Sequence, residues 1–309
     1  MVAPGAAAPK AWVDGAVVEW GDAALQANSQ SNFGVCAFEG IRAYARADGR
    51  ACVFRLCEHV TRLFDTCRML LLRPALDARA VTEGCLEVLR ANQMSEAYLR
   101  PLVFPARGSL DIYDDQPASC VIMAWSWGSY AGPEGLSKGI RAKVSSFARQ
   151  HVNAGLPKAK VMGQYVNSVL AKREARAAGY DEALMADTGG YVCEATTANL
   201  FVVKKGTLFT PDLANSVLEG ITRDTIVQLA REVGVPVVEG RLTRDQVWLA
   251  DEVFLTGTAS EVTPVREVDD RQIGSGEVGP LTRVLQERFF EVARGAGASH
   301  PHWLTPYEF

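Results

Sequence analysis

Residues 156–201 read LPKAKVMGQYVNSVLAKREARAAGYDEALMADTGGYVCEATTANLF, and the rest of the chain is organised around this stretch. Lys160 lies in a segment of small residues just ahead of an expected helix, 165–178, which ends at a C-cap glycine, Gly179. Glu194 follows at the mouth of an expected pair of strands. By spacing alone these would be two solvated charges, since lysine and glutamate are almost never fully buried without a partner.

A lysine and a carboxylate also supply what one kind of cofactor requires. An aldehyde cofactor that carries a ring nitrogen needs an amine to form a Schiff base. It also needs an anion that keeps the ring nitrogen protonated, so that the ring can accept electrons. Lys158 competes with Lys160 for the role of the amine, and the residue types alone leave this choice open.

Size and charge narrow the class of protein. The chain has 309 residues, which is comfortable for two domains, and 48% of them are apolar, which allows a large core. The net charge is -4, which gives no reason to expect nucleic acid or an anionic membrane as partner. No apolar run approaches the roughly 20 residues of a membrane span, and the first residues lack the pattern of a secretory signal.

Cysteine and histidine usage points to a reducing compartment and to no metal. The seven cysteines are odd in number and contain no CxxC pair, so we expect reduced thiols in a cytoplasmic protein. The four histidines show no metal-ligand spacing with the cysteines.

Periodicity and turn residues predict a mixed α and β chain with two domains. In the N-terminal third, the expected strands and helices lie at 11–20, 35–55, 57–72, 77–93, 97–104 and 120–127. A segment rich in glycine and serine follows, and it is typical of a connection between domains. Beyond it, the expected elements lie at 140–147, 165–178, 182–186, 191–193, 222–233, 237–239, 252–256 and 279–292. We therefore expect a small domain over 1–128, an interdomain loop over 129–138 and a large domain over 139–309.

Seven segments in order resemble the branched-chain amino acid aminotransferase family, the class IV pyridoxal-phosphate enzymes. They are AFEGIRAY (37–44), VFRLCEHVTRL (53–63), AYLRPLVF (97–104), KVMGQYVNSVLAKREARAAGYDEAL (160–184), GGYVCEATTANLF (189–201), LEGITRD (218–224) and LADEVFLTGTASEVTPV (249–265). The resemblance covers roughly residues 12 to 280, and this is far more specific than one short motif.

The resemblance implies a fold and an activity. The fold is α+β, a two-domain fold type IV enzyme similar to D-amino acid aminotransferase, with a small N-terminal α/β domain and a larger C-terminal domain built on a mixed sheet. The activity is pyridoxal-phosphate-dependent transamination of branched-chain or other hydrophobic L-amino acids with 2-oxoglutarate or another 2-oxo acid. It runs through an aldimine on Lys160 and a 1,3-prototropic shift. The family also implies a homodimer, or a higher assembly of dimers, and a place in branched-chain amino acid biosynthesis.

The resemblance assigns the family's site residues to positions of this chain, according to the register of the motifs. Counted back from Gly163-Gln164-Tyr165, the family's catalytic lysine falls on Lys160 and not on Lys158. The residues that the resemblance assigns to the cofactor are Arg55, Lys160, Tyr165, Glu194, Ile221, Thr222 and Thr258. For Ile221 and Thr222 a physical reason stands beside the resemblance, because they open a helix after a glycine, and a helix N-terminus binds phosphate.

The substrate pocket is assigned in the same way. A pocket that accepts both an apolar amino acid and glutamate needs an apolar wall and a group that meets a side-chain carboxylate. The residues that the resemblance assigns to it are Phe38, Arg100, Tyr130, Thr258 and Ala259, with Arg42 and Tyr98 as neighbours.

Two departures leave the amino donor and the outcome of the reaction open. Phe33 stands where the family usually has a tyrosine, which removes one donor from the side-chain carboxylate site. The loop 107–116 carries three aspartates in place of a glycine-rich pattern. The alternatives are a pathway-specific amino acid transaminase, an amine or D-amino acid transaminase, an aminodeoxychorismate-type lyase, and a non-catalytic protein on the same fold. The last would be signalled by loss of Lys160 or Glu194, and both are present.

Overall fold

The computed structural model describes residues 8–23, 30–46, 48–105, 117–296 and 299–309. These residues divide into two compact units. The N-terminal unit takes the described residues up to Gly128 together with Ala159–Gln164 and Glu291–Phe309. The C-terminal unit takes Ser129–Lys158 and Tyr165–Phe290.

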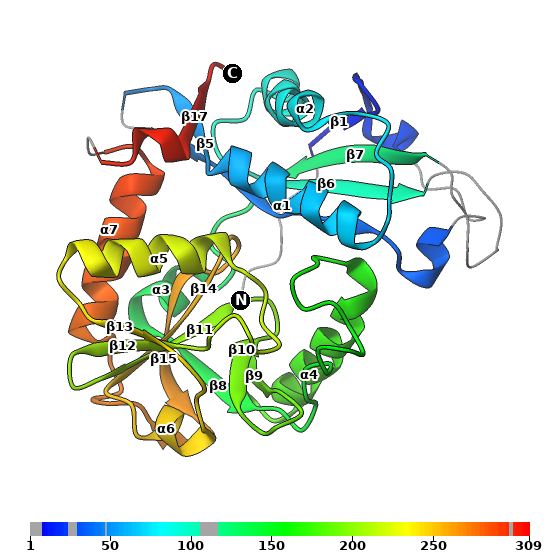
Figure 1. Cartoon of the computed structure of the whole chain (residues 1–309). Helices are drawn as coiled ribbons and strands as arrows, with labels where there is room; N and C mark the ends of the chain where they lie inside the picture. Colours follow the sequence, from blue (N-terminus) through cyan, green and yellow to red (C-terminus); the bar gives the residue numbers. More distant parts are fainter. Residues whose placement is uncertain (1–7, 24–29, 47, 106–116, 297–298) are drawn as a thin grey trace. The chain divides into compact units, whose positions relative to one another are not determined.

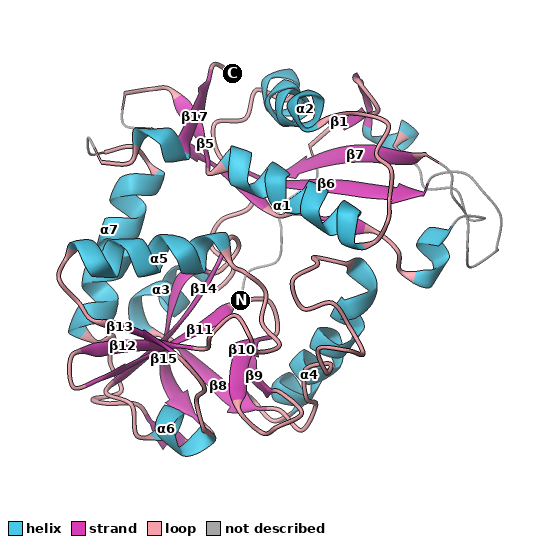
Figure 2. Ribbon diagram, in the orientation of Figure 1, coloured by secondary structure: helices cyan, strands magenta, loops and turns pink. Residues whose placement is uncertain are grey.

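The N-terminal unit is built on one antiparallel sheet. Its strands, in spatial order, are β17 (Leu304–Tyr307), β5 (Ala51–Phe54), β4 (Ile41–Ala45), β6 (Ala97–Pro105), β7 (Ala118–Trp125), β1 (Lys10–Val13) and β2 (Ala16–Glu19), and β3 (Ala37–Phe38) pairs with β6. The long strands β6 and β7 form its middle (Figure 2). The 3-10 turns η1 (Trp20–Asp22), η2 (Gln30–Phe33), η3 (Met162–Gln164) and η4 (Pro301–Trp303) belong to the same unit.

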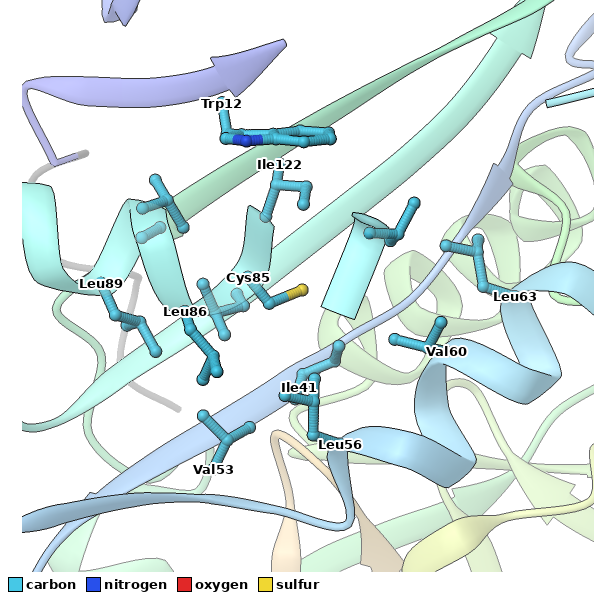
Figure 3. Packing of buried hydrophobic residues seen from close by; sticks show 14 of the residues in the cluster. Trp12, Ile41, Val53, Leu56, Val60, Leu63, Cys85, Leu86, Leu89 and Ile122 are labelled. Atoms are coloured by element: carbon cyan, nitrogen blue, oxygen red, sulfur yellow. The ribbon is translucent and has the colours of Figure 1, made fainter. Parts of the chain in front are cut away.

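Two amphipathic helices, α1 (Leu56–Met69) and α2 (Ala78–Ala91), bury their apolar faces in the core of this unit. Asp77 begins α2 by accepting a hydrogen bond from the backbone N–H of Ala80 at 2.8 Å. Trp12 lies over the core in Figure 3, next to Ile122. A Cβ added at Gly84 would come within 2.6 Å of the Trp12 ring, so glycine at this helical position leaves room for the indole.

The C-terminal unit contains a mixed sheet of nine strands. Their order is β10 (Val192–Ala195), β9 (Glu182–Ala186), β8 (Ile140–Val144), β15 (Glu261–Val268), β14 (Glu252–Gly257), β11 (Asn199–Lys204), β12 (Thr207–Thr210) and β13 (Val237–Glu239), with β16 (Arg271–Gln272) paired to β15. Because β10 also pairs with β11, six of these strands close into a ring.

The C-terminal unit also contains helices. They are α3 (Gly132–Lys138), α4 (Tyr165–Ala177), α5 (Ile221–Glu232) and α6 (Arg244–Trp248), and α7 (Pro280–Ala293) runs from this unit into residues of the other. In Figure 1, α4 lies beside β9, and α5 contacts β14. Among the described residues no helix has both the length and the apolar character needed to cross a membrane.

The expected α+β architecture is confirmed, and the compact units differ from the expected boundaries in three places. The expected interdomain loop contains α3 and belongs to the C-terminal unit. The segment Ala159–Gln164, which was expected in the large domain, joins the N-terminal unit. The end of the chain returns to that unit as well, because β17 pairs with β5.

Candidate active site

Backbone hydrogen bonds hold Lys160 in the N-terminal unit. Its N–H donates to the hydroxyl of Thr66 on α1 at 3.1 Å, and its carbonyl accepts from the N–H of Phe38 at 3.0 Å. The N–H of Met162 donates to the carbonyl of Cys36 at 2.9 Å. The lysine therefore lies on a short extended segment that is paired with the strand carrying Phe38.

A close approach of two glycines completes this pairing. The N–H of Gly163 donates to the carbonyl of Gly34 at 3.1 Å. Gly34 has a φ of 78°, and a Cβ there would come within 2.7 Å of the Gly163 Cα. Only glycine meets both conditions without strain.

The side chains of Lys160 and Arg100 both reach the ring of Phe38. The Lys160 Nζ lies 4.9 Å from the ring centre, and the Arg100 Cζ lies 4.7 Å from it. Arg100 also donates to the hydroxyl of Tyr98 at 3.0 Å, and its Nε is buried without a partner among the described residues. A buried guanidinium N–H of this kind is suited to a ligand carboxylate, because an unmade bond to a charged group is costly.

A buried ion pair lies next to Phe38 in sequence. Glu39 is fully buried, and its carboxylate binds Arg62 at 2.6 Å and His59 at 2.7 Å. Burial favours the neutral acid, but the charge of Arg62 and the bond to His59 outweigh it and hold the pKa of Glu39 well below its usual range. Burial lowers the pKa of His59, so this imidazole is neutral near pH 7.

Arg55, at the start of α1, contacts Glu58 and Trp303. Arg55 begins α1 in a left-handed conformation, pairs with Glu58 at 2.7 Å and stacks its guanidinium 4.9 Å from the Trp303 ring. Arg62, two turns further along α1, holds the carboxylate beside Phe38. The sequence prediction did not name Arg62, the second arginine of the motif VFRLCEHVTRL, and its assignment of Arg55 stays a prediction.

In the C-terminal unit, Glu194 is buried among donors. Its Oε1 pairs with Arg149 at 2.8 Å. Its Oε2 accepts from the N–H of Leu218 at 3.0 Å and from Nδ2 of Asn199 at 3.3 Å. All three contacts favour the ionised carboxylate, which is the state that a protonated ring nitrogen requires.

The N-terminus of α5 offers an anion site beside Glu194. Its N-cap is Gly220, which has no side chain to occupy the first-turn amides, and Ile221 and Thr222 are the first helical residues. A Cβ at Gly220 would collide with Oδ1 of Asn199, whose amide binds Glu194. The buried hydroxyl of Thr256, opposite Asn199 in the sheet, has no partner among the described residues. A helix N-terminus without a side-chain cap and an orphaned hydroxyl fit a phosphate group.

The remaining predicted residues of this unit lie at two places. The N–H of Tyr130 donates to the carbonyl of Ala259 at 3.1 Å, so Tyr130 lies against the turn of Thr258 and Ala259 between β14 and β15. Tyr165 is the first residue of α4.

Lys158, the competing lysine, is committed elsewhere. Its ammonium donates to the carbonyls of Val217 at 2.8 Å and Asn215 at 3.3 Å, just ahead of α5. Burial lowers its pKa, although Glu219 and Glu194 act in the other direction.

Phe33, the first departure from the family pattern, is 53% exposed. The loop 107–116 lies outside the described residues. No group of three possible metal ligands occurs in the described ranges.

A family model described as Amino-transferase class IV matches residues 36–268. The chain belongs to this family. It is 43% identical to the branched-chain-amino-acid aminotransferase of Pseudomonas aeruginosa, over 95% of this chain and 96% of that one.

Solved structures agree with this membership of the class IV aminotransferases. The branched-chain amino acid aminotransferase of Escherichia coli superposes with a TM-score of 0.93 at 40% identity, covering 96% of this chain and 98% of that one. The enzyme from Thermobaculum terrenum, solved in its PLP-form, superposes with a TM-score of 0.91 at 33% identity, covering 97% of this chain and 98% of that one. The resemblance predicted from the motifs is therefore confirmed at the level of family and fold.

Proposed function

We propose that the protein is a pyridoxal-phosphate-dependent aminotransferase that moves an amino group between branched-chain L-amino acids and a 2-oxo acid. The observation that carries the proposal is the full-length likeness to branched-chain aminotransferases, in a chain that retains Lys160 and a buried, ionised Glu194. The bound cofactor supplies an aldehyde for the amine and a ring that accepts electrons.

The chain's own residues then have separate tasks. Lys160 would hold the aldehyde carbon of the cofactor, and its free amine would remove the proton from the substrate α-carbon. Glu194 keeps the ring nitrogen protonated, and Arg149 with the N–H of Leu218 keeps Glu194 charged. Tyr165 is assigned to the ring or its 3'-oxygen.

For the phosphate we propose the N-terminus of α5, with Ile221 and Thr222, together with Thr258 and the orphaned hydroxyl of Thr256. For its arginine we propose Arg55, which the motif register assigns, because Arg62 already binds the buried carboxylate of Glu39 through its Nε and Nη2. Arg55→Met should weaken cofactor retention, measured by absorbance after desalting. Retention equal to that of the wild-type protein would contradict the assignment.

For the substrate we propose Phe38 as an apolar wall, the turn of Thr258 and Ala259 for the α-carboxylate, and Arg100 for a side-chain carboxylate. The buried Nε–H of Arg100 could bind the side-chain carboxylate of glutamate, which supports glutamate as an amino donor. Phe33 lacks the hydroxyl of the usual tyrosine, and a lost hydrogen bond to a charged group costs about 1.5–3 kcal/mol. Glutamate should therefore be a weaker donor than leucine.

The assembly proposed is a homodimer or an assembly of dimers. The outer face of α4 supports it, because Val166, Val169 and Leu170 recur at helical spacing and are 63%, 47% and 40% exposed. We also propose a cytoplasmic location, supported by seven cysteines that are all unpaired.

A substrate panel tests the function. Leucine, isoleucine, valine, glutamate, D-alanine and a simple amine are each supplied with 2-oxoglutarate or pyruvate. Turnover of the branched-chain amino acids should exceed that of D-alanine and the amine. Borohydride reduction and peptide mass analysis should place a pyridoxyl group on Lys160. Lys160→Ala should abolish both this labelled peptide and the turnover. A preference for D-alanine or the amine would contradict the proposal.

A further inference from the structure

A lysine lies next to the ring of Tyr130 in the C-terminal unit, and this lysine is paired with a glutamate. The Nζ of Lys172, on α4, lies 5.1 Å from the centre of the Tyr130 ring. The same ammonium donates to Oε2 of Glu182, at the start of β9, at 2.6 Å. The two charged side chains are only 18% and 4% exposed, so this is not a surface ion pair.

Glu182 leaves the ammonium little freedom. Its other oxygen accepts from the hydroxyl of Thr196 at 2.6 Å and from the N–H of Ala183 at 2.9 Å. A buried carboxylate that is satisfied on both oxygens holds its partners in one arrangement, because any other arrangement would leave a buried charge unpaired. Lys172 is therefore fixed against the tyrosine ring.

Tyr130 is constrained from two sides. Its backbone N–H binds the carbonyl of Ala259, and its ring meets Lys172. Burial raises the pKa of Tyr130 to about 12, and the charge of Glu182 adds to this, so the phenol remains a hydrogen-bond donor. A cation against a ring in a partly dry site favours one ring orientation.

We propose that Lys172, held by Glu182, is a positioning residue that fixes the ring of Tyr130 for substrate binding. The inference rests on the proposed function, in which Tyr130 lines the substrate pocket. Fixing the ring before substrate arrives avoids the entropy cost of ordering it during binding. Loss of Lys172 should therefore raise KM and leave kcat nearly unchanged.

The test compares steady-state KM and kcat for leucine and its 2-oxo acid acceptor in the holoenzyme and four variants: Lys172→Met, Lys172→Arg, Tyr130→Leu, and Lys172→Met combined with Tyr130→Leu. Lys172→Met should raise KM by ~5- to 30-fold, the range of a desolvated cation and ring contact. Lys172→Arg keeps the cation and should recover most of the loss. The double variant should be no worse than Tyr130→Leu, because Lys172 acts through the tyrosine.

Two further variants serve as controls. Lys138→Met removes an exposed lysine from its pair with Glu134 at 2.9 Å, and it should change neither constant. Lys172→Met leaves the Glu182 charge buried and can unfold the protein. Lys172→Met combined with Glu182→Gln removes both charges and should show the same rise in KM in a folded enzyme.

The outcomes separate this inference from the function on which it rests. Additive losses in the variant that combines Lys172→Met with Tyr130→Leu would overturn the inference. An unchanged KM in the folded enzyme that combines Lys172→Met with Glu182→Gln would also overturn it. In either case, a raised KM in Tyr130→Leu would preserve the assignment of Tyr130 to the substrate pocket. An unchanged KM in Tyr130→Leu overturns the inference and the pocket assignment together. Loss of all transamination in the wild-type protein would instead reject the proposed function.

Discussion

The carboxylate of Glu194, for which we propose contact with the cofactor's ring nitrogen, is surrounded by hydrogen-bond donors. An arginine, a backbone N–H and an amide all donate to it. Its negative charge is therefore maintained by fixed partners rather than by solvent, and its buried position costs less than that of an isolated ion.

Glu194→Gln should reduce kcat by ~10²-fold or more, the scale of a lost proton-holding group. The amide oxygen can still accept from Leu218 and Asn199, so cofactor should remain partly bound. Stopped-flow turnover and absorbance after desalting measure the two effects. Undiminished turnover would refute the role assigned to Glu194.

Glu39 should make the protein sensitive to acid. Burial acts to raise its pKa, but Arg62 and His59 lower it below the unfolded value of about 4.3. The stabilisation is therefore complete above that value and is lost as pH falls through the folded pKa. His59, whose pKa burial lowers, disfavours folding in the same direction once pH falls below about 6.5.

The melting temperature of wild-type protein and Glu39→Gln, measured from pH 7 to pH 3, checks this. The gap between the two should be largest at pH 7, where breaking the buried pair costs ~3–5 kcal/mol, and should narrow in acid. A gap that does not change with pH would contradict it.

At the scale of elements, the site depends on close contacts between segments far apart in sequence. The segment that carries Lys160 pairs with residues 34–38, and the glycines Gly34 and Gly163 allow it to approach. The N-cap of α5 packs against Asn199 in the same manner. Glycines at these points allow the segment that carries Lys160 and the N-terminus of α5 to lie close to their neighbours.

Gly34→Ala should both destabilise the protein and lower activity. A side chain at φ 78° costs about 1–2 kcal/mol, and the new Cβ would displace the backbone next to Lys160. Gly206→Ala is the matched control, because Gly206 has a φ of 75° with nothing near its Cβ position. The control should lose stability but keep kcat. Equal kcat in both variants would show that the glycine contact does not position Lys160.

At the scale of the whole molecule, the outer face of α4 decides the oligomeric state in our proposal. Val169→Glu should shift the protein toward monomer, because a charge inside an apolar interface is costly to bury. Leu249→Glu introduces the same charge at a leucine outside α4 that is 68% exposed, and it should leave the mass unchanged. Light scattering over a range of concentrations measures both, and a wild-type mass for Val169→Glu would argue against this interface.

Much of this protein could be predicted without coordinates. Apolar periodicity located α1, α2, α4, α5 and α7 to within a few residues, since the pattern that makes a helix amphipathic is local. The family register predicted Lys160, Glu194 and the start of α5. The relation to the class IV aminotransferases follows from the order of the motifs, and the full-length likeness confirmed it.

Partners across the fold were decided only by tertiary structure. Whether Arg55 or Arg62 meets Glu39, which carbonyls hold Lys158, and that Lys172 lies against Tyr130 all depend on how distant elements align. The return of residues 291–309 to the first sheet is of the same kind. A sequence pattern records which face of an element is apolar, but the neighbour of a charged side chain is set by strand register and helix packing between segments that the pattern does not connect.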